Sequence, residues 1–314
     1  MMIGLPVQAG KPMVSVGFVG FHRLFNPVWN HITIPLARHY SIDVVESDSM
    51  RVPDYLFFSV YGHSHLNPRY ASCVKIFTSE ENIRPPWNEC DYAMTGDHLD
   101  NDRRHLRTPI YVRYLYYSTE TSGRSIVKPA DYDPVSILHS KTRFCNFVFS
   151  NGHAKERLKF LDILSKYKTV ECGGGVRNSL GYRVTDKLKF LESYKFTIAF
   201  ENSSYPGYIS EKLVEPMVSN SIPIYWGCPR VGDDFNPSSF VNATGRNLED
   251  VVEEVIHLDL NDSAYMAMLS QSWFHDNKPN LYCQEDRLVG FLNRVFSSRT
   301  DSRQENYARL GLST

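Results

Sequence analysis

Short apolar runs, separated by polar or amphipathic stretches, recur along the first half of the chain. Met13–Val19 has the continuous apolar character of a strand inside a parallel sheet, and Trp29–Tyr40 follows with apolar residues at helical spacing. The further runs that we expect to be strands are Ile42–Glu46, Tyr55–Val60, Cys73–Phe77, Tyr92–Thr95 and Pro109–Tyr116. This alternation predicts an α/β unit with a mostly parallel sheet.

The same alternation begins again after the polar stretch Ser118–Lys128. The expected strands are Phe144–Ser150, Thr169–Cys172, Phe196–Phe200 and Ile222–Trp226, and the expected helices are Lys155–Tyr167, Thr185–Tyr194, Asn247–His257, Ser263–Phe274 and Asp286–Phe296. We therefore predict two α/β domains, residues 1–136 and 137–314, with a tail after residue 297 that frays or packs back on the first domain. Two such halves would place a ligand cleft between them, beyond the carboxyl ends of the strands.

Composition narrows the class of protein. The chain has 42% hydrophobic and 22% charged residues and a net charge of −1, as in soluble globular proteins and unlike nucleic-acid binders. The six cysteines form no CxxC pair, so we expect reduced thiols in a cytosolic protein. The N-terminus lacks a signal peptide, and we expect no transmembrane segment.

The residues do not favour a metal site. The eleven histidines show no HxH or HExxH spacing. Asp131-Tyr-Asp133 matches the DxD pattern of metal-dependent glycosyltransferases, but this very short match lies in the expected linker, and we attribute it to chance.

The segment from Asn202 to Lys212 carries the strongest chemical signal. It follows an expected strand and leads through a Pro-Gly turn into a helix that begins near Ser210, a good N-cap residue. The free N–H groups of a helix start favour an anion, and Lys212 adds a positive charge there. Glu211 could accept ribose hydroxyls, and Asn202 and Tyr208 complete a set that suits a sugar nucleotide. An exposed Glu–Lys pair at a helix start is the competing interpretation.

Two features of this region stay open. Pro216 lies inside the helical stretch, so the helix either starts late or kinks there. Arg157, at the start of the helix after Phe144–Ser150, could pair with a phosphate through its planar fork, and Lys155 could do so through its ammonium. Taken alone, these residues are better explained as ordinary surface charges on an amphipathic helix.

Two adjacent carboxylates follow the expected strand Cys73–Phe77. Glycosyl transfer with inversion needs one base that deprotonates the acceptor hydroxyl, and Glu81 or Glu80 could serve. The alternative interpretation is a solvated loop.

The residues quoted above resemble those of one known family. Phe200-Glu-Asn-Ser, Tyr208-x-Ser-Glu-Lys-Leu213, Ile222-Pro-Ile-Tyr-Trp-Gly227 and Asp234-Phe-Asn-Pro resemble the donor-site signature of the α-1,3/4-fucosyltransferases, glycosyltransferase family 10, of the bacterial type. The block from Ser150 through Arg157 to Gly173-Gly174 is similar to the part that precedes it. Ser79-Glu-Glu-Asn82 resembles the acceptor half.

The resemblance implies a GT-B fold with two Rossmann-like domains facing a cleft, an acceptor-binding domain first and a GDP-fucose-binding domain second. It implies inverting transfer of L-fucose from GDP-β-L-fucose to O3 or O4 of GlcNAc in a lactosamine-type glycan. We expect no required cofactor, and a divalent ion such as Mn²⁺ would act only as a stimulator. Oligomeric state is left open, and the expected location is the cytoplasm or the inner-membrane periphery.

The resemblance also assigns roles to single residues. Glu81 falls on the general base, and Arg157 and Lys212 fall on diphosphate contacts. The other donor-binding positions are Asn202, Tyr208, Glu211, Ser150 and Gly174. A GT-B enzyme with another nucleotide-sugar donor and a glycan-binding protein without catalysis are the alternatives.

Overall fold

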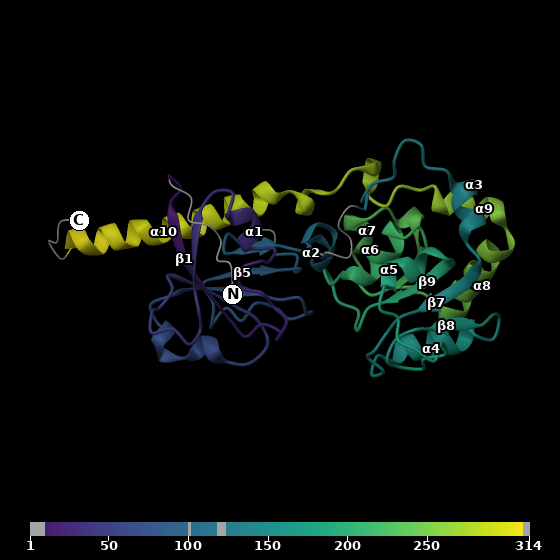
Figure 1. Cartoon of the computed structure of the whole chain (residues 1–314), viewed down its shortest axis with the longest axis horizontal. Helices are drawn as coiled ribbons and strands as arrows, with labels where there is room; N and C mark the ends of the chain where they lie inside the picture. Colours follow the sequence, from purple (N-terminus) through teal and green to yellow (C-terminus); the bar gives the residue numbers. More distant parts are fainter. Residues whose placement is uncertain (1–9, 100–101, 118–123, 310–314) are drawn as a thin grey trace. The chain divides into compact units, whose positions relative to one another are not determined.

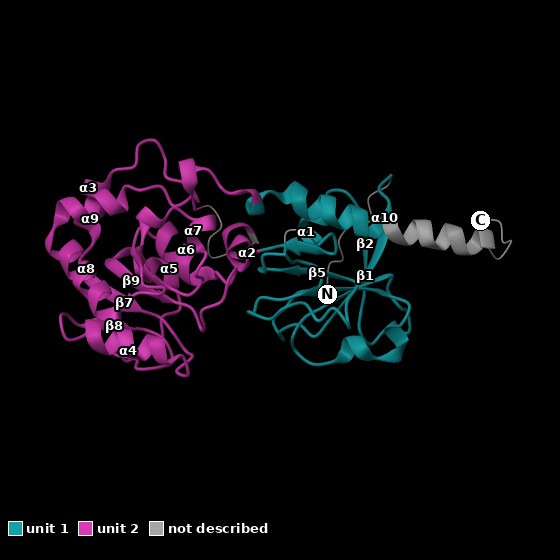
Figure 2. Ribbon diagram, turned by 180° about the vertical axis from the view of Figure 1, so that it is seen from behind, with its two compact units in different colours: residues 1–108, 282–314 teal, residues 109–281 magenta. Residues whose placement is uncertain are grey.

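The chain forms two compact units. The computed structural model describes residues 10–99, 102–117 and 124–309. Unit 1 combines the chain up to Thr108 with the segment from Tyr282 onward, and unit 2 is Pro109–Leu281 (Figure 2). Both units are α/β with a parallel sheet, as the sequence predicts.

Unit 1 is built on six parallel strands in the order β2-β1-β3-β4-β5-β6. The strands are β1 (Met13–Val19), β2 (Ser41–Val45), β3 (Tyr55–Phe58), β4 (Val74–Thr78), β5 (Tyr92–Thr95) and β6 (His105–Arg107). Helix α1 (Thr33–Leu36) and the short 3₁₀ helices η1 (Ser64–Leu66) and η2 (Pro68–Tyr70) connect them. Because β1 lies between β2 and β3, the strand order reverses at β1.

The C-terminal helix α10 (Glu285–Arg309) belongs to unit 1 (Figure 1). Its Phe291, Leu292, Val295 and Phe296 are buried against β1, β3 and α1 in one apolar core. The boundaries of the units therefore differ from the predicted division at residue 136. Residues 109–136 group with unit 2, and the helix from Glu285 returns to unit 1 because its apolar face completes the core there.

Unit 2 has five parallel strands in the order β11-β10-β9-β7-β8. They are β7 (Arg143–Phe147), β8 (Val170–Cys172), β9 (Tyr194–Phe200), β10 (Ile222–Trp226) and β11 (Val241–Asn242). The strand order reverses between β7 and β9, since the chain passes from β7 to β8 on one side and then to β9 on the other. Such a reversal is where open α/β sheets bind ligands.

Helices cover both faces of this sheet. Helices α4 (Lys155–Leu164), α8 (Leu248–Leu260) and α9 (Asp262–Leu269) pack on one face around the main core, and α5 (Lys187–Glu192) packs with α6 (Glu211–Val218) against β9. The remaining helical segments are α2 (Ile110–Tyr117), α3 (Pro134–Ser140), α7 (Val231–Asp234), η3 (Pro237–Ser239), η4 (His275–Asn277) and η5 (Leu281–Cys283), the last of which runs into unit 1.

The predicted strand Pro109–Tyr116 is wrong, because these residues form the helix α2. Pro109 precedes the first helical residue, where its fixed φ suits a helix start. Ile110, Tyr111 and Leu115 are buried, and α2 packs on α6. Tertiary packing thus outweighs the strand preference of the many aromatic and β-branched residues.

The predicted helix Trp29–Tyr40 is much shorter in the structure, where only Thr33–Leu36 is helical. The Asn30 side chain accepts hydrogen bonds from the backbone N–H groups of Ile32 and Thr33, at 2.9 and 3.0 Å, which forms a turn before the helix. Pro35 then falls in the first turn, where a missing N–H does not matter.

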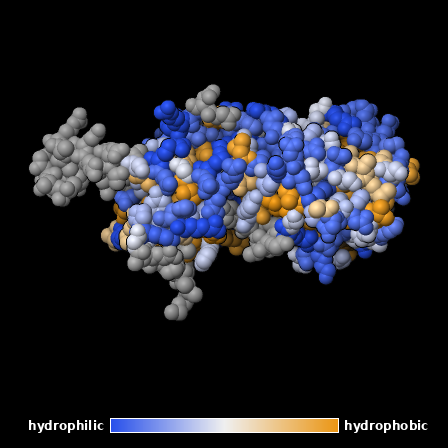
Figure 3. All heavy atoms as spheres, turned by 90° about the horizontal axis from the view of Figure 1, so that it is seen from above, coloured by the Kyte–Doolittle hydropathy of each residue, from blue (hydrophilic) through white to orange (hydrophobic). Residues whose placement is uncertain are grey.

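One face of the molecule shows how apolar and polar residues are distributed over the surface. On the face drawn in Figure 3, hydrophilic residues predominate and hydrophobic atoms gather in separate small areas. Exposed apolar residues of this scattered kind need no special explanation. Among the residues that the structure describes, no helix has the length and apolar character needed to cross a membrane.

Candidate functional site

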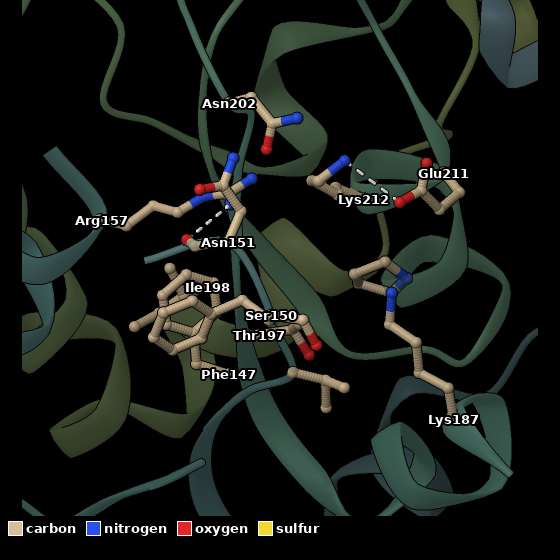
Figure 4. A pocket seen from close by; sticks show the side chains of 13 residues that line it. Phe147, Ser150, Asn151, Arg157, Lys187, Thr197, Ile198, Asn202, Glu211 and Lys212 are labelled. Carbon is tan, nitrogen blue, oxygen red and sulfur yellow. Dashed lines mark hydrogen bonds and ion pairs between the residues drawn. The ribbon is translucent and has the colours of Figure 1, made fainter. Parts of the chain in front are cut away.

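A pocket of about 180 Å³ lies in unit 2, where the chain leaves β7 and β9. Five of the predicted donor-binding residues line it, namely Ser150, Arg157, Asn202, Glu211 and Lys212. In Figure 4 the polar ends of Arg157, Asn202 and Lys212 gather at one end of this pocket, while Phe147 and Ile198 lie toward the other. The pocket is thus at the reversal point of the sheet, where α/β folds place ligands.

The start of α6 is held by a carboxylate that the sequence reasoning missed. Ser210 is the N-cap, and its side chain accepts a hydrogen bond from the Lys212 N–H. The backbone N–H and hydroxyl of Ser210 both donate to Glu201 Oε1, at 2.7 and 2.9 Å. Glu201 is fully buried, and a Cβ added to Gly227 would lie 2.5 Å from its Cγ. Glycine at position 227 therefore makes room for Glu201.

Lys212 lies between two carboxylates. Its Nζ is 3.3 Å from Glu201 Oε2 and 3.1 Å from Glu211 Oε1, and it donates to Ser210 Oγ at 3.0 Å. Burial disfavours the charge on Lys212, but Glu201 and Glu211 outweigh this effect and raise its pKa. The ammonium group is therefore charged and held in position next to the pocket.

Glu211 and Lys187 bring a second pair of charges to the same pocket. Burial raises the pKa of Glu211, but the neighbouring Lys212 and Lys187 outweigh it, and the net pKa is lowered. Lys187, near the start of α5, also forms an ion pair with the buried Glu215 of α6. Asp186-Lys187 belongs to the residues that carry the family resemblance, but the sequence assigned Lys187 no role in the site, although it lines the pocket.

Arg157 is almost completely buried, with 1% of its surface exposed. Its Nε and Nη2 donate to the carbonyl oxygen of Phe200 at 2.9 and 2.6 Å, which fixes the guanidinium at the end of β9. Burial lowers the pKa of Arg157, and Glu201, Tyr208 and Glu211 oppose that shift. An arginine seated on carbonyl groups inside a pocket is not an ordinary surface charge.

Two of the predicted donor-binding residues, Tyr208 and Gly174, lie outside the lining of this pocket. Tyr208 is buried with 4% exposure and does not line this pocket; its carbonyl accepts a hydrogen bond from the Tyr225 hydroxyl at 3.4 Å. Gly174 does not line the pocket either. A Cβ at this position would lie 1.9 Å from the Phe149 carbonyl oxygen, so glycine is required by the close approach of two backbone segments.

The bounds of α6 exclude one of the two alternatives for Pro216, a late start of the helix. The helix begins at Glu211, directly after its N-cap Ser210, and ends at Val218, so Pro216 lies near its C-terminal end. Pro216 also lines the pocket.

Glu81 lies in unit 1, after the end of β4. Its backbone N–H donates to Ser79 Oγ at 2.9 Å, and its carbonyl accepts from the Ile83 N–H at 2.8 Å, so the loop is a compact turn. The side chain is half-buried. Glu81 therefore lies at the carboxyl edge of the unit 1 sheet.

Asp133 of the DxD match has a local structural role. It is the N-cap of α3, and its side chain accepts from the Val135 N–H at 3.0 Å. Within the described residues, no three His, Cys, Asp or Glu side chains form a group that could hold a metal ion.

Comparisons with known proteins identify the family. Residues 16–114 match the model of the alpha-(1,3)-fucosyltransferase FucT N-terminal domain, and residues 138–292 match that of the glycosyltransferase family 10 (fucosyltransferase) C-terminal region. Alpha-(1,3)-fucosyltransferase FucT of Helicobacter pylori is 33% identical over 267 residues, which are 76% of this chain and 55% of that protein. The chain thus spans about half the length of this relative.

Solved structures that are similar to this chain belong to the same class of enzyme. A crystal structure of an alpha1,3-fucosyltransferase is 26% identical, with a TM-score of 0.78, and the match covers 94% of this chain and 93% of that one. A structure of an alpha1,3-fucosyltransferase with GDP-fucose is also 26% identical, with a TM-score of 0.74 and 92% coverage of both chains. The fold is therefore of the GT-B class that the sequence indicated, and the chain belongs to glycosyltransferase family 10, the fucosyltransferases.

Proposed function

We propose that this protein is an inverting fucosyltransferase that moves L-fucose from GDP-β-L-fucose to GlcNAc in a lactosamine-type glycan. O3 is the favoured acceptor position, since the relatives above are named alpha-1,3-fucosyltransferases, and O4 is the alternative. The main support is the pair of held cations, Arg157 and Lys212, in a pocket at the β7–β9 reversal point.

These cations suit a diphosphate leaving group. As the bond between fucose C1 and the phosphate oxygen breaks, the electron pair leaves with GDP, and negative charge grows on the diphosphate. Arg157 and Lys212 would stabilise that charge without reorganising. Of the residues that line the pocket, Asn202 and Glu211 would hold the phosphate, fucose or ribose, and Ser150 would support the donor. Donor contacts of Tyr208 and Gly174, which do not line it, are proposed from the resemblance alone.

The acceptor half of the reaction needs a base. We assign this role to Glu81, which would take the proton of the acceptor hydroxyl as its oxygen forms the new bond to C1 from the face opposite GDP. This geometry gives inversion and an α-linked product.

We further propose that no metal ion is required, because two held cations meet the charge of the diphosphate. A divalent ion such as Mn²⁺ would then act only as a stimulator. EDTA-treated protein should keep most of its transfer activity; complete loss with recovery on adding Mn²⁺ would contradict this.

A cytoplasmic location at or near the inner membrane is proposed from the resemblance to bacterial-type members alone. Fractionation of cells that express the chain tests it, since recovery in a secreted fraction would contradict it.

The decisive experiment is a transfer assay with GDP-fucose and a panel of type 1 and type 2 lactosamine acceptors, with the linkage of the product determined by NMR. A product with fucose α-linked to O3 or O4 of GlcNAc is expected. Thermal-shift measurements with GDP and UDP separate donor classes, since only the nucleotide that binds stabilises the fold. Stabilisation by UDP alone would favour another donor, and no response to either would favour glycan binding without catalysis.

A further inference from the structure

The loop between β9 and α6, residues 201–210, is tied to other parts of unit 2 through its last residues. The hydrogen-bonding partners of Gly207, Tyr208, Ile209 and Ser210 are Cys228, Tyr225, Tyr111 and Glu201, in that order. Asn202, near the start of the loop, lines the pocket described above, whereas none of these partners does. The loop is therefore held in place from outside the pocket.

Two of the partners lie at the end of β10. Tyr225 is completely buried, and its hydroxyl accepts a hydrogen bond from the Cys228 N–H at 3.0 Å and donates to the Tyr208 carbonyl at 3.4 Å. Cys228 is also completely buried, and its Sγ accepts a hydrogen bond from the Gly207 N–H at 3.1 Å. The Tyr225 hydroxyl thus fixes Cys228, and the two residues together hold the backbone at Gly207 and Tyr208.

Gly207 makes this support necessary. Its φ is +91°, a conformation that glycine adopts readily. Glycine also loses more conformational freedom on folding than any other residue, so a loop that turns at a glycine does not keep one conformation by itself. The hydrogen bonds from Cys228 and Tyr225 restrict the loop at this point.

The Tyr225 hydroxyl lies next to the carboxylate that holds the start of α6. A Cβ added to Gly227 would lie 2.8 Å from the Tyr225 oxygen and 2.5 Å from Glu201 Cγ, so the two side chains meet at this glycine. Burial and the nearby Glu201 raise the pKa of Tyr225, so the hydroxyl keeps the proton that it donates. Glu201 therefore fixes the helix start, and Tyr225 with Cys228 fixes the part of the loop that precedes it.

We propose that Tyr225 and Cys228 are positioning residues for donor binding. They hold the backbone at Gly207 and Tyr208, and thereby keep the loop that begins near Asn202 in the conformation that binds the nucleotide sugar. The inference rests on the proposed function, because it takes the pocket of unit 2 as the donor site.

The separate support of Lys212 predicts which kinetic parameter changes. Glu201 holds the Lys212 ammonium without help from Tyr225 or Cys228, so the charge that would stabilise the leaving diphosphate stays in place when the loop is loosened. Loosening the loop therefore weakens binding of the donor in the ground state and in the transition state alike. Such a change raises KM and leaves kcat nearly unchanged.

The test compares wild type with Tyr225→Phe, Cys228→Ala and Cys228→Ser. The matched control is Tyr265→Phe, because Tyr265 is also completely buried and its hydroxyl donates to the Lys195 carbonyl at 3.0 Å. Lys195 lies near the start of β9, at the opposite end of the strand from the loop. Calorimetric titration gives the Kd for GDP, donor kinetics give KM and kcat, and thermal unfolding shows that each protein is folded.

We expect Tyr225→Phe and Cys228→Ala to raise the Kd for GDP and the KM for GDP-fucose about tenfold, as loss of one hydrogen-bonding contribution would. Cys228→Ser should recover most of the affinity, because its hydroxyl also accepts a hydrogen bond from Gly207. Tyr265→Phe should lower the Tm and keep the Kd and KM of wild type. Unchanged Kd and KM in Tyr225→Phe and Cys228→Ala, or equal losses in Tyr265→Phe, would overturn the proposal.

Titration of UDP in parallel separates this proposal from the proposed function. Binding of UDP in place of GDP, weakened in Tyr225→Phe and Cys228→Ala, would support the positioning role and reject GDP-fucose as the donor. Transfer of fucose by wild type, with the same GDP affinity in every variant, would reject the positioning role and leave the proposed function intact. A folded wild type that binds neither nucleotide would overturn both.

Discussion

The ammonium group of Lys212 lies 3.3 Å from the buried carboxylate of Glu201, at the start of α6. Glu201 also accepts two hydrogen bonds from Ser210, the residue that caps the same helix. One carboxylate therefore holds the helix start and the cation together. The Lys212 charge is in position before any ligand arrives, as expected of a preorganised anion site.

The ion pair between Lys212 and Glu201 leads to a prediction about the stability of the fold. Lys212→Met should lower the free energy of unfolding by about 3 kcal/mol, because it leaves the buried charge of Glu201 without its partner. The double variant Lys212→Met with Glu201→Gln removes both charges and should recover much of that loss. Chemical denaturation measures both, and a double variant no more stable than Lys212→Met would contradict the pairing.

A separate prediction concerns GDP affinity. The double variant should bind GDP roughly 10- to 100-fold more weakly than wild type, because hydrogen bonds to charged groups contribute about 1.5–3 kcal/mol. Lys189→Met, an exposed lysine on the neighbouring helix α5, is the control and should leave affinity unchanged. Calorimetric titration separates the outcomes, and wild-type affinity in the double variant would reject the phosphate role of Lys212.

The assignment of Glu81 as the base predicts a loss of turnover without a loss of donor binding. Glu81→Gln should lower kcat by a factor of about 100 or more, since general bases contribute that much, while the Kd for GDP stays unchanged. Glu80→Gln is the matched control from the same loop. If Glu80→Gln loses activity and Glu81→Gln keeps it, the base is Glu80.

Gly174 should tolerate no side chain. In Gly174→Ala the new Cβ would overlap the Phe149 carbonyl, so we expect destabilisation by at least about 2 kcal/mol and a lower Tm. Gly232→Ala is the control, because a Cβ there meets nothing within 4 Å. Equal Tm values for the two variants would show that the backbone approach is not tight.

We expect the buried side chain of Lys128 to make the stability of the fold depend on pH. Burial lowers its pKa from 10.5 to about 7 while its ammonium donates to the Leu269 carbonyl and lies 4.3 Å from the Tyr132 ring centroid. Between pH 7 and 10.5 the unfolded chain then binds more protons at this site than the folded one. Its contribution to stability therefore rises with pH in this window, by up to about 1.4 kcal/mol per unit.

The variant Lys128→Met isolates this effect, because it keeps the apolar stem and removes the charge. Unfolding free energies measured from pH 7 to 9 should rise more steeply in wild type than in the variant. Parallel curves would mean that Lys128 stays protonated in the folded protein.

Local patterns in the sequence were sufficient to predict most of the strands and to single out five residues that line one pocket of unit 2. Met13–Val19 and Ile222–Trp226 have the predicted bounds, because continuous apolar runs of strand length are buried on both faces of a parallel sheet. Arg157 follows β7, whereas Asn202 and Lys212 follow its neighbour β9. They line the same pocket because parallel strands end at one edge of the sheet.

Features that depend on contacts between residues far apart in the sequence could be seen only in the tertiary structure. Residues 110–117 form a helix whose apolar side packs against α6. The helix that begins at Glu285 belongs to unit 1 because its apolar residues are buried in the core of that unit. Glu201 was missed for the same reason. A carboxylate after a strand looks like a solvated loop residue until the fold surrounds it with Ser210, Lys212 and Gly227. The sequence by itself determined which chemical groups this protein carries and at which edge of the sheet they lie, whereas long-range packing determined their partners, burial and charge.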